Sequence, residues 1–111
     1  MKAGKVRALA VTTPGRISPL PDLPTVEESG YPGFDAPAWQ GFSVPAGTPR
    51  EAVMRLNAAY IKAIGDREMV QRFTDLGAQL IPSTPEEMTA YVKSEIEKWG
   101  RAVRAGNISL D

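Results

Sequence analysis

The sequence predicts an α/β protein in which three longer helices pack on a few short strands. In the second half of the chain, residues 48–65, 67–77 and 84–105 repeat apolar side chains at spacings of three and four, which is typical of helices with one buried face. Residues 5–12 form a short apolar stretch and residues 38–44 alternate in side-chain type, and both patterns predict short strands. A segment rich in proline and glycine joins the two predicted strands.

The composition excludes several classes of function. Thirteen basic and thirteen acidic side chains cancel in this chain of 111 residues, so it lacks the positive field that binding to nucleic acid requires. Cysteine is absent, which excludes disulfides and thiol chemistry. Histidine is absent too, which removes the commonest general base and transition-metal ligand. We therefore expect a single domain with no enzyme activity, no metal and no cofactor.

Membrane and export signals are not expected either. No apolar run approaches the roughly 20 residues that span a bilayer. Met1 to Lys5 leads into the first predicted strand without the hydrophobic region of a signal peptide. We expect nothing in this sequence to export or anchor the chain.

Three polar residues follow the first predicted strand. Thr12, Thr13 and Arg16 lie in or just after the turn that Pro14 and Gly15 predict. In open α/β sheets, ligands gather beyond the carboxyl ends of strands, and the guanidinium fork of arginine matches a carboxylate. These three are candidate ligand-binding residues. The alternative is structural: the threonines hydrogen-bond the turn and the arginine is solvated.

Residues 20–49 predict an ordered crossover punctuated by short elements, because proline fixes φ and favours extended geometry in the residue before it. Seven of the ten prolines lie within this segment or at its edge. Thr25 and Glu28 have the spacing of a capping box, in which each side chain binds the backbone amide of the other, and Gly30 can end the helical turn that follows. Trp39 lies in the strand predicted downstream.

The three predicted helices have start and stop signals. Thr48 and Thr84 are each followed by a proline and, three positions on, by a glutamate, which predicts a capping box at both starts. Gly65, Gly77 and Gly106 follow the last periodic residues and predict the three ends.

Two short pieces complete the chain. Residues 78–81 predict a very short strand, and residues 108–111 predict an extended or frayed tail. Trp99, on the apolar side of the last helix, is expected to pack in the core. Trp39 is a candidate wall of a ligand pocket, with packing beneath the crossover as the alternative.

Adjacent carboxylates occur twice, at Glu27-Glu28 and Glu86-Glu87. Neighbours in a helix point about 100° apart and share a proton poorly. Helix capping and the helix dipole explain both pairs, so neither predicts acid/base chemistry or a metal site.

The motifs RALAVT (residues 7–12), LPDLPTVEESG (20–30), WQGF (39–42) and PAGTP (45–49) follow one another in the sequence. With Leu56-Asn57 and Lys98-Trp99 further on, this order resembles the tripartite tricarboxylate transporter substrate-binding proteins, also called the Bug family. The resemblance covers nearly the whole chain.

That resemblance implies the type II, flytrap-like fold of a periplasmic binding protein, whose two lobes close on dicarboxylates or tricarboxylates and deliver them to a membrane permease. Because family members are much longer, the chain resembles their C-terminal portion only. Residues 1–19 would end one lobe, residues 20–45 would cross over with a short helix and strand, and residues 46–111 would return as helices into the other lobe.

Two functional hypotheses result. The first is a non-enzymatic, periplasmic solute-binding component, or a fragment of one, whose missing N-terminal half supplies much of the site. The resemblance implies a site that holds carboxylate largely through loop hydroxyls, backbone amides and water, so Thr25 joins Thr12 and Thr13 as an expected ligand-binding residue. Arg16, after the first strand, and Trp39, as an aromatic wall, complete the expected set. The alternative is a truncated standalone half without transport activity, acting as a homo-oligomer or interaction module, because an isolated strand would present unpaired edges.

Overall fold

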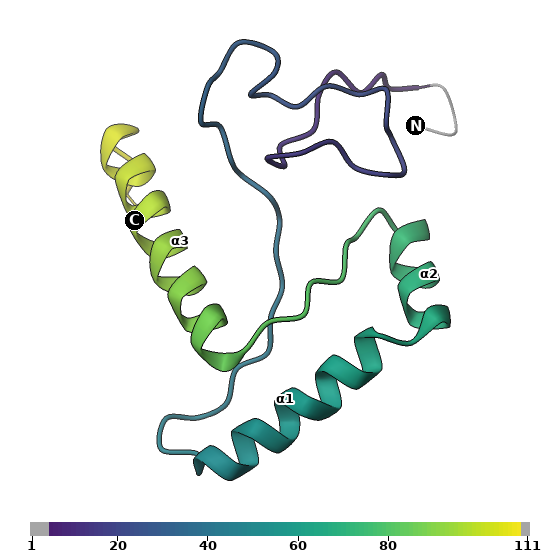
Figure 1. Cartoon of the computed structure of the whole chain (residues 1–111). Helices are drawn as coiled ribbons and strands as arrows, with labels where there is room; N and C mark the ends of the chain where they lie inside the picture. The colour runs from purple at the N-terminus through teal and green to yellow at the C-terminus, as the bar shows by residue number, and fades with distance from the viewer. Residues whose placement is uncertain (1–4, 110–111) are drawn as a thin grey trace. The chain divides into compact units, whose positions relative to one another are not determined.

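Three helices make up the regular structure of the computed structural model, which describes residues 5–109 (Figure 1). They are α1 (Arg50–Ile64), α2 (Arg67–Asp75) and α3 (Pro85–Ala105). All three lie where apolar periodicity predicts them, which confirms the helical part of the fold. In the predicted tail, Ile108 and Ser109 belong to no helix or strand, and residues 110–111 lie outside the described range.

The three individual strand predictions are wrong for the described residues. Residues 5–12, 38–44 and 78–81 contain no strand, and the one bridge described within residues 5–109 is an isolated parallel pairing of Val11 with Thr25. A strand needs a neighbouring backbone to accept and donate its hydrogen bonds. The local sequences have strand character, but no backbone in the described part of the chain forms a ladder with them.

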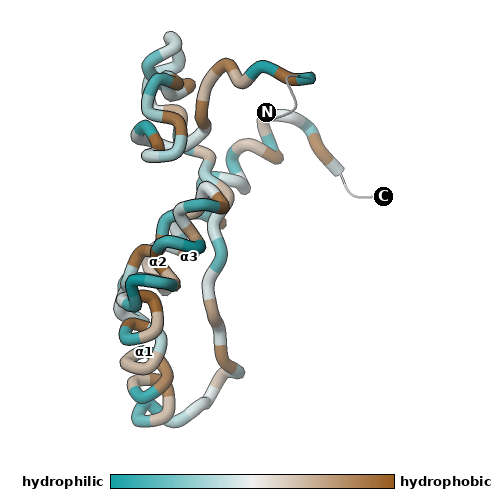
Figure 2. Tube along the Cα trace, turned by 90° about the vertical axis from the view of Figure 1, so that its right-hand side faces the viewer, coloured by the Kyte–Doolittle hydropathy of each residue, from teal (hydrophilic) through white to brown (hydrophobic). Residues whose placement is uncertain are grey.

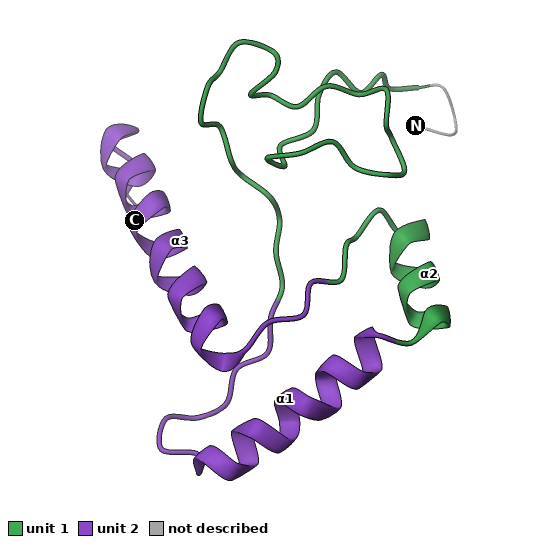
Figure 3. Cartoon of the chain, in the orientation of Figure 1, with its two compact units in different colours: residues 1–40, 66–80 green, residues 41–65, 81–111 purple. Residues whose placement is uncertain are grey.

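The chain divides into two compact units (Figure 3). Unit 1 comprises residues 1–40 and 66–80, and unit 2 comprises residues 41–65 and 81–111. Unit 1 therefore contains the proline-rich turns and α2, whereas unit 2 contains α1 and α3.

Within unit 2, α3 begins with the predicted capping box. The Thr84 hydroxyl accepts a hydrogen bond from the Glu87 amide at 3.1 Å, and the Glu87 carboxylate accepts one from the Thr84 amide at 2.7 Å. Pro85 is the first helical residue, where its missing N–H has no consequence. Gly106 is the C-cap, which confirms the predicted end.

The capping box predicted for α1 is wrong. Its N-cap is Pro49, and no side chain caps the helix. The Thr48 hydroxyl instead donates to the Pro45 carbonyl at 2.8 Å, and the Thr48 amide donates to the same oxygen at 3.2 Å. The Thr48 hydroxyl is therefore engaged in the preceding turn and does not cap α1. Gly65 is the C-cap of α1, as predicted.

This difference between the two helix starts is testable. Thr84→Ala should lower the free energy of unfolding by about 1 kcal/mol, because it removes an N-cap acceptor. Thr48→Ala should have a smaller effect, since it removes only an exposed turn hydrogen bond. Chemical denaturation of both variants and the unsubstituted chain checks the ranking, and a larger loss for Thr48→Ala would contradict it.

Polar contacts tie α1 to the start of α3, and an aromatic contact ties α1 to the segment that precedes it. The Asn57 side-chain amide donates to the Ser83 carbonyl at 2.8 Å, just before α3 begins. Arg50 and Glu86 form an exposed ion pair of 3.0 Å. The rings of Phe42 and Tyr60 meet edge to face at a centroid distance of 5.3 Å. Contacts of different kinds therefore fix the start of each helix and the middle of α1.

In unit 1, α2 begins at Asp66, whose carboxylate accepts from the amides of Glu68 and Met69 at 3.0 and 3.1 Å. Its end follows the prediction, because Gly77 adopts a φ of +79° that favours glycine. The next amide, that of Ala78, donates to the Phe73 carbonyl at 2.9 Å.

Few apolar side chains are buried. Ile64, 8% exposed, is the one buried hydrophobic side chain among the described residues. Figure 2 shows apolar and polar residues alternating along the helices, and each helix carries large exposed apolar side chains, among them Leu56, Val70 and Ile96. Trp99 is 48% exposed, so its predicted place in the core is wrong. Its indole N–H donates to the carboxylate of Glu95 at 3.0 Å.

Candidate functional site

Four of the five candidate ligand-binding residues lie in one part of unit 1, which we call the turn cluster and define as residues 11–16 and 24–29. Its two segments are joined by the backbone. The Val11 amide donates to the Pro24 carbonyl and the Val26 amide to the Val11 carbonyl, both at 2.9 Å. These bonds place Thr12 and Thr25 on adjoining backbone although they are far apart in the sequence.

Thr25 and Glu28 form the predicted capping box. The Thr25 hydroxyl accepts from the Glu28 amide at 3.0 Å, and the Glu28 carboxylate accepts from the Thr25 amide at 2.8 Å. Ser29 closes the turn through its amide and hydroxyl, which both donate to the Thr25 carbonyl. Gly30 ends it with a φ of +106°. Thr25 is 2% exposed, so its hydroxyl is the buried cap of a turn. Residues 26–30 form turns, and the short helix predicted for this part of the crossover is wrong.

Three hydrogen bonds hold the Arg16 side chain, two to Glu28 of the cluster and one to the backbone at Pro21. Its Nε donates to both carboxylate oxygens of Glu28, at 3.2 and 3.0 Å, and its Nη1 donates to the Pro21 carbonyl at 3.2 Å. The Arg16 and Glu28 side chains are each 47% exposed. The structural alternative of a purely solvated arginine therefore does not describe Arg16, which is held in place and still faces water.

The two threonines before Arg16 differ. The Thr13 hydroxyl donates to the Gly15 carbonyl at 2.7 Å, the turn bond that the structural alternative expects. Thr12 is exposed, and its carbonyl accepts from the Ala36 amide at 3.0 Å. The Thr12 backbone thus fastens the later loop to the cluster, while its side chain remains at the surface.

Trp39 lies further along the chain, on an extended stretch of unit 1, with its side chain 40% exposed. The hydrogen bonds described above join the other four candidates and do not include it.

The sequence predicts Glu28 as a capping residue but not as a member of the candidate site. Its spacing to Thr25 predicts the capping role, and that role is present. Its ion pair with Arg16 spans twelve positions in the sequence, and no local pattern predicts such a contact.

Hydrogen bonds lower the pKa of Glu28 below its ordinary value of 4.5. The largest cause is the bond from the Thr25 amide, followed by the bond from Arg16, whose charge adds to the effect, and partial desolvation opposes them. The pKa values of Glu86 and Glu87 are lowered as well. Each of these carboxylates is therefore better stabilised as an anion in the folded chain.

Acid should weaken the chain for this reason. A carboxylate whose folded pKa lies below its unfolded pKa stabilises the fold above the unfolded value, and this stability is lost as the pH falls through the folded value. We expect the melting temperature to fall below pH 4.5 and Glu28→Gln to make that fall shallower. Melting curves of Glu28→Gln and the unsubstituted chain between pH 7 and pH 3 measure this fall. An unchanged slope in Glu28→Gln would contradict a lowered pKa of this carboxyl.

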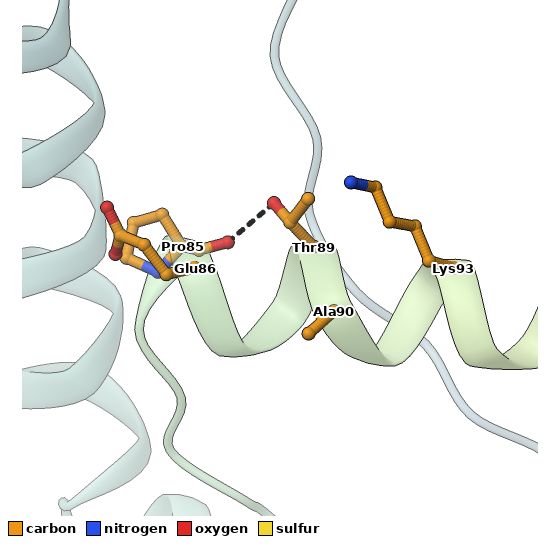
Figure 4. Close-up of a pocket in the computed structure, with 5 residues that line it drawn as sticks. All are labelled: Pro85, Glu86, Thr89, Ala90 and Lys93. Carbon is orange, nitrogen blue, oxygen red and sulfur yellow. Dashed lines mark hydrogen bonds between the residues drawn. The ribbon is translucent and has the colours of Figure 1, made fainter.

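Two surface hollows lie elsewhere. One, of about 340 Å³, is lined by the first turns of α3 (Figure 4). There the Thr89 hydroxyl donates back to the Pro85 carbonyl at 2.7 Å, and in this view the Lys93 side chain runs back along the helix toward Thr89. Another, of about 430 Å³, is lined by Ala52, Arg55 and Leu56 of α1. Both lie along a single helix and are open to solvent, so neither is a convergent binding site.

Two kinds of feature are not found in the described residues. No helix in the described range combines the length and the apolar character needed to cross a membrane. In residues 5–109, no three His, Cys, Asp or Glu side chains are grouped as metal ligands would be.

The fold places the chain in the class of periplasmic binding proteins. It matches the structure of R. palustris Rpa4515 with adipate at a TM-score of 0.82 and 34% sequence identity, over 97% of this chain and 36% of that one. It matches the periplasmic binding protein BugD at a TM-score of 0.76 and 35% identity, over 98% of this chain and 37% of that one.

Sequence comparison identifies the family. Residues 1–108 match the tripartite tricarboxylate transporter family receptor, TctC, and the chain belongs to this family. A relative from Pseudomonas sp. strain P51, the UPF0065 protein in the tcbD-tcbE intergenic region, is 41% identical over 91% of this chain and 30% of its own length. Protein BugT of Bordetella pertussis is 32% identical over 99% of this chain and 34% of its own length. The chain therefore spans about a third of the length of these relatives, and the resemblance read from its motifs is confirmed.

Proposed function

We propose that the chain is the C-terminal portion of a periplasmic receptor that binds small organic dicarboxylates or tricarboxylates for uptake by a tripartite tricarboxylate-type transporter. The observation that carries the proposal is the likeness to Rpa4515, whose structure contains adipate and which matches nearly all of this chain. The membrane permease of such a transporter is the expected partner. Family membership supports a receptor, not an enzyme.

The turn cluster is the proposed site for one carboxylate of the ligand. Arg16 supplies a fixed positive charge beside exposed Thr12 and the Thr13 turn, and guanidinium groups bind carboxylates through paired hydrogen bonds. Thr25 contributes by shaping the turn. Trp39 is proposed as an aromatic wall of the same ligand site, and the remaining contacts would come from the N-terminal half of a full-length receptor.

Thermal melting of the chain with adipate tests the proposal, with succinate, malate, citrate and glutamate in parallel. Hexanoate is the matched control, because it has the same carbon chain as adipate and one carboxylate fewer. A ligand at 100 times its Kd adds about 2.7 kcal/mol to stability, so the binding acid should raise the melting temperature in a saturable way and hexanoate should not. A cooperative melt that no acid shifts would contradict binding by this chain.

The exposed apolar side chains favour a second candidate function, that of a standalone half that assembles with copies of itself or acts as an interaction module. Large apolar groups such as Leu9 and Phe42 are 72% and 84% exposed, and surfaces of this kind are commonly covered by another chain. Sedimentation velocity over a range of concentrations distinguishes the two. A monomer that binds adipate supports the receptor, and a stable oligomer that binds no acid supports the second candidate.

A further inference from the structure

One carboxylate connects the two segments of the turn cluster. The Glu28 oxygens accept from the Thr25 amide at 2.8 Å within their own segment and from Arg16 Nε at 3.0 and 3.2 Å in the other. The pair is half exposed, and exposed ion pairs contribute little to stability. Its importance is therefore geometric, because it fixes the direction of the guanidinium.

The bonds to Arg16 leave part of its guanidinium free for a ligand. Of its nitrogens, Nε is directed to Glu28 and Nη1 to the Pro21 carbonyl. For Nη2, no acceptor is recorded in the described part of the chain. A guanidinium has five N–H donors in a rigid fork, so the Nη2 donors remain available to a ligand while Nε and Nη1 hold the group in place.

We infer that Glu28 is a positioning residue of the carboxylate site: it holds Arg16 and the Thr12–Thr13 turn in the arrangement that binds ligand without contacting the ligand itself. This inference rests on the proposed function. It goes beyond the capping role, because a cap alone needs only the Thr25 amide, whereas Glu28 also holds a side chain from a distant segment.

The chain contains a matched control for this inference. Thr84 and Glu87 form the same capping box at the start of α3, with an amide-to-carboxylate bond of 2.7 Å. No ion pair of Glu87 is described within residues 5–109. Glu87→Gln therefore removes a capping carboxylate alone, whereas Glu28→Gln removes the cap charge together with the anchor of Arg16.

Amide hydrogen exchange tests the positioning role without any ligand. The amides of Val11, Val26 and Ala36 join the segments of the cluster and its following loop. Glu28→Gln and Arg16→Gln should each speed exchange at Val11 and Ala36 by about threefold or more, since local opening becomes easier. The double variant should add little to either single one, because both remove the same contact. Glu87→Gln should leave these amides unchanged, and unchanged exchange in Glu28→Gln would overturn the inference.

Adipate affinity, measured by titration calorimetry on the same variants, tests the link to binding. Glu28→Gln should weaken the binding of adipate by about tenfold, as expected when an oriented charge-assisted contact is lost. Glu87→Gln should leave adipate binding unchanged. Arg16→Lys should be intermediate, because it keeps the charge and loses the fork. Equal losses in Glu28→Gln and Glu87→Gln would overturn the inference. If the unsubstituted chain binds no adipate while the exchange pattern holds, the proposed function fails for this acid and the structural tie stands.

Discussion

Ile64→Ala should lower the free energy of unfolding by about 2–4 kcal/mol, more than other apolar truncations in α1. Ile64 is the one buried hydrophobic side chain in the described residues, and truncating a buried isoleucine loses its transfer free energy and leaves a cavity. It also lies at the last residue of the helix, immediately before the Gly65 C-cap. Urea denaturation, with the slope compared between variants, gives the difference directly.

Ile61→Ala is the matched control, because it makes the same chemical change one turn earlier in the same helix. Ile61 is 39% exposed, so its truncation should cost less than about 1 kcal/mol. Equal effects of the two substitutions would show that Ile64 is no better packed than its neighbour.

Glu95→Ala should lower the free energy of unfolding by about 3 kcal/mol, because it removes the acceptor of the half-exposed Trp99 indole N–H and the ion partner of the buried Lys98 ammonium. Glu95 is 4% exposed. Its carboxylate accepts from the indole N–H of Trp99 at 3.0 Å and forms an ion pair with Lys98. Lys98 also lies 5.7 Å from the centre of the Trp99 ring, so the three side chains form one polar group on α3.

Two further variants test whether the loss comes from the hydrogen bond to Trp99 and the ion pair with Lys98. Glu95→Gln keeps an acceptor for Trp99 and loses the charge opposite Lys98, so its effect should fall between the unsubstituted chain and Glu95→Ala. Glu97→Ala, on the same helix at an exposed position, should change stability by less than about 0.5 kcal/mol. If Glu97→Ala matched Glu95→Ala, the buried contacts could not be the cause.

The helices could be predicted because their signals are local. Periodicity, the Thr84 capping box and the terminal glycines each operate within a few residues, and the structure confirms them. The strands could not, because residues 5–12 and 38–44 need a neighbouring backbone that a local pattern cannot supply. The capping box predicted at Thr48 is absent for a related reason. The Thr48 hydroxyl binds the Pro45 carbonyl in the preceding turn and does not cap α1.

In the candidate site, too, local contacts could be predicted from the sequence and long-range contacts could not. The bonds between Thr25 and Glu28 follow from their three-residue spacing and were predicted. The contact of Glu28 with Arg16 depends on the backbone bridge between Val11 and Thr25, which no local pattern contains. The ordered motifs, by contrast, identified the family correctly, while the ligand contacts themselves remain proposals.

The scarcity of buried apolar side chains has a calorimetric consequence. The heat-capacity change of unfolding arises mainly from apolar surface that becomes hydrated, and amounts to about 12–15 cal/mol/K per residue for ordinary globular domains. A chain whose large apolar side chains, such as Ile96 and Leu76, are already in water has less such surface left to expose. Its heat-capacity change should therefore fall below that range, and its stability should vary with temperature along an unusually flat curve.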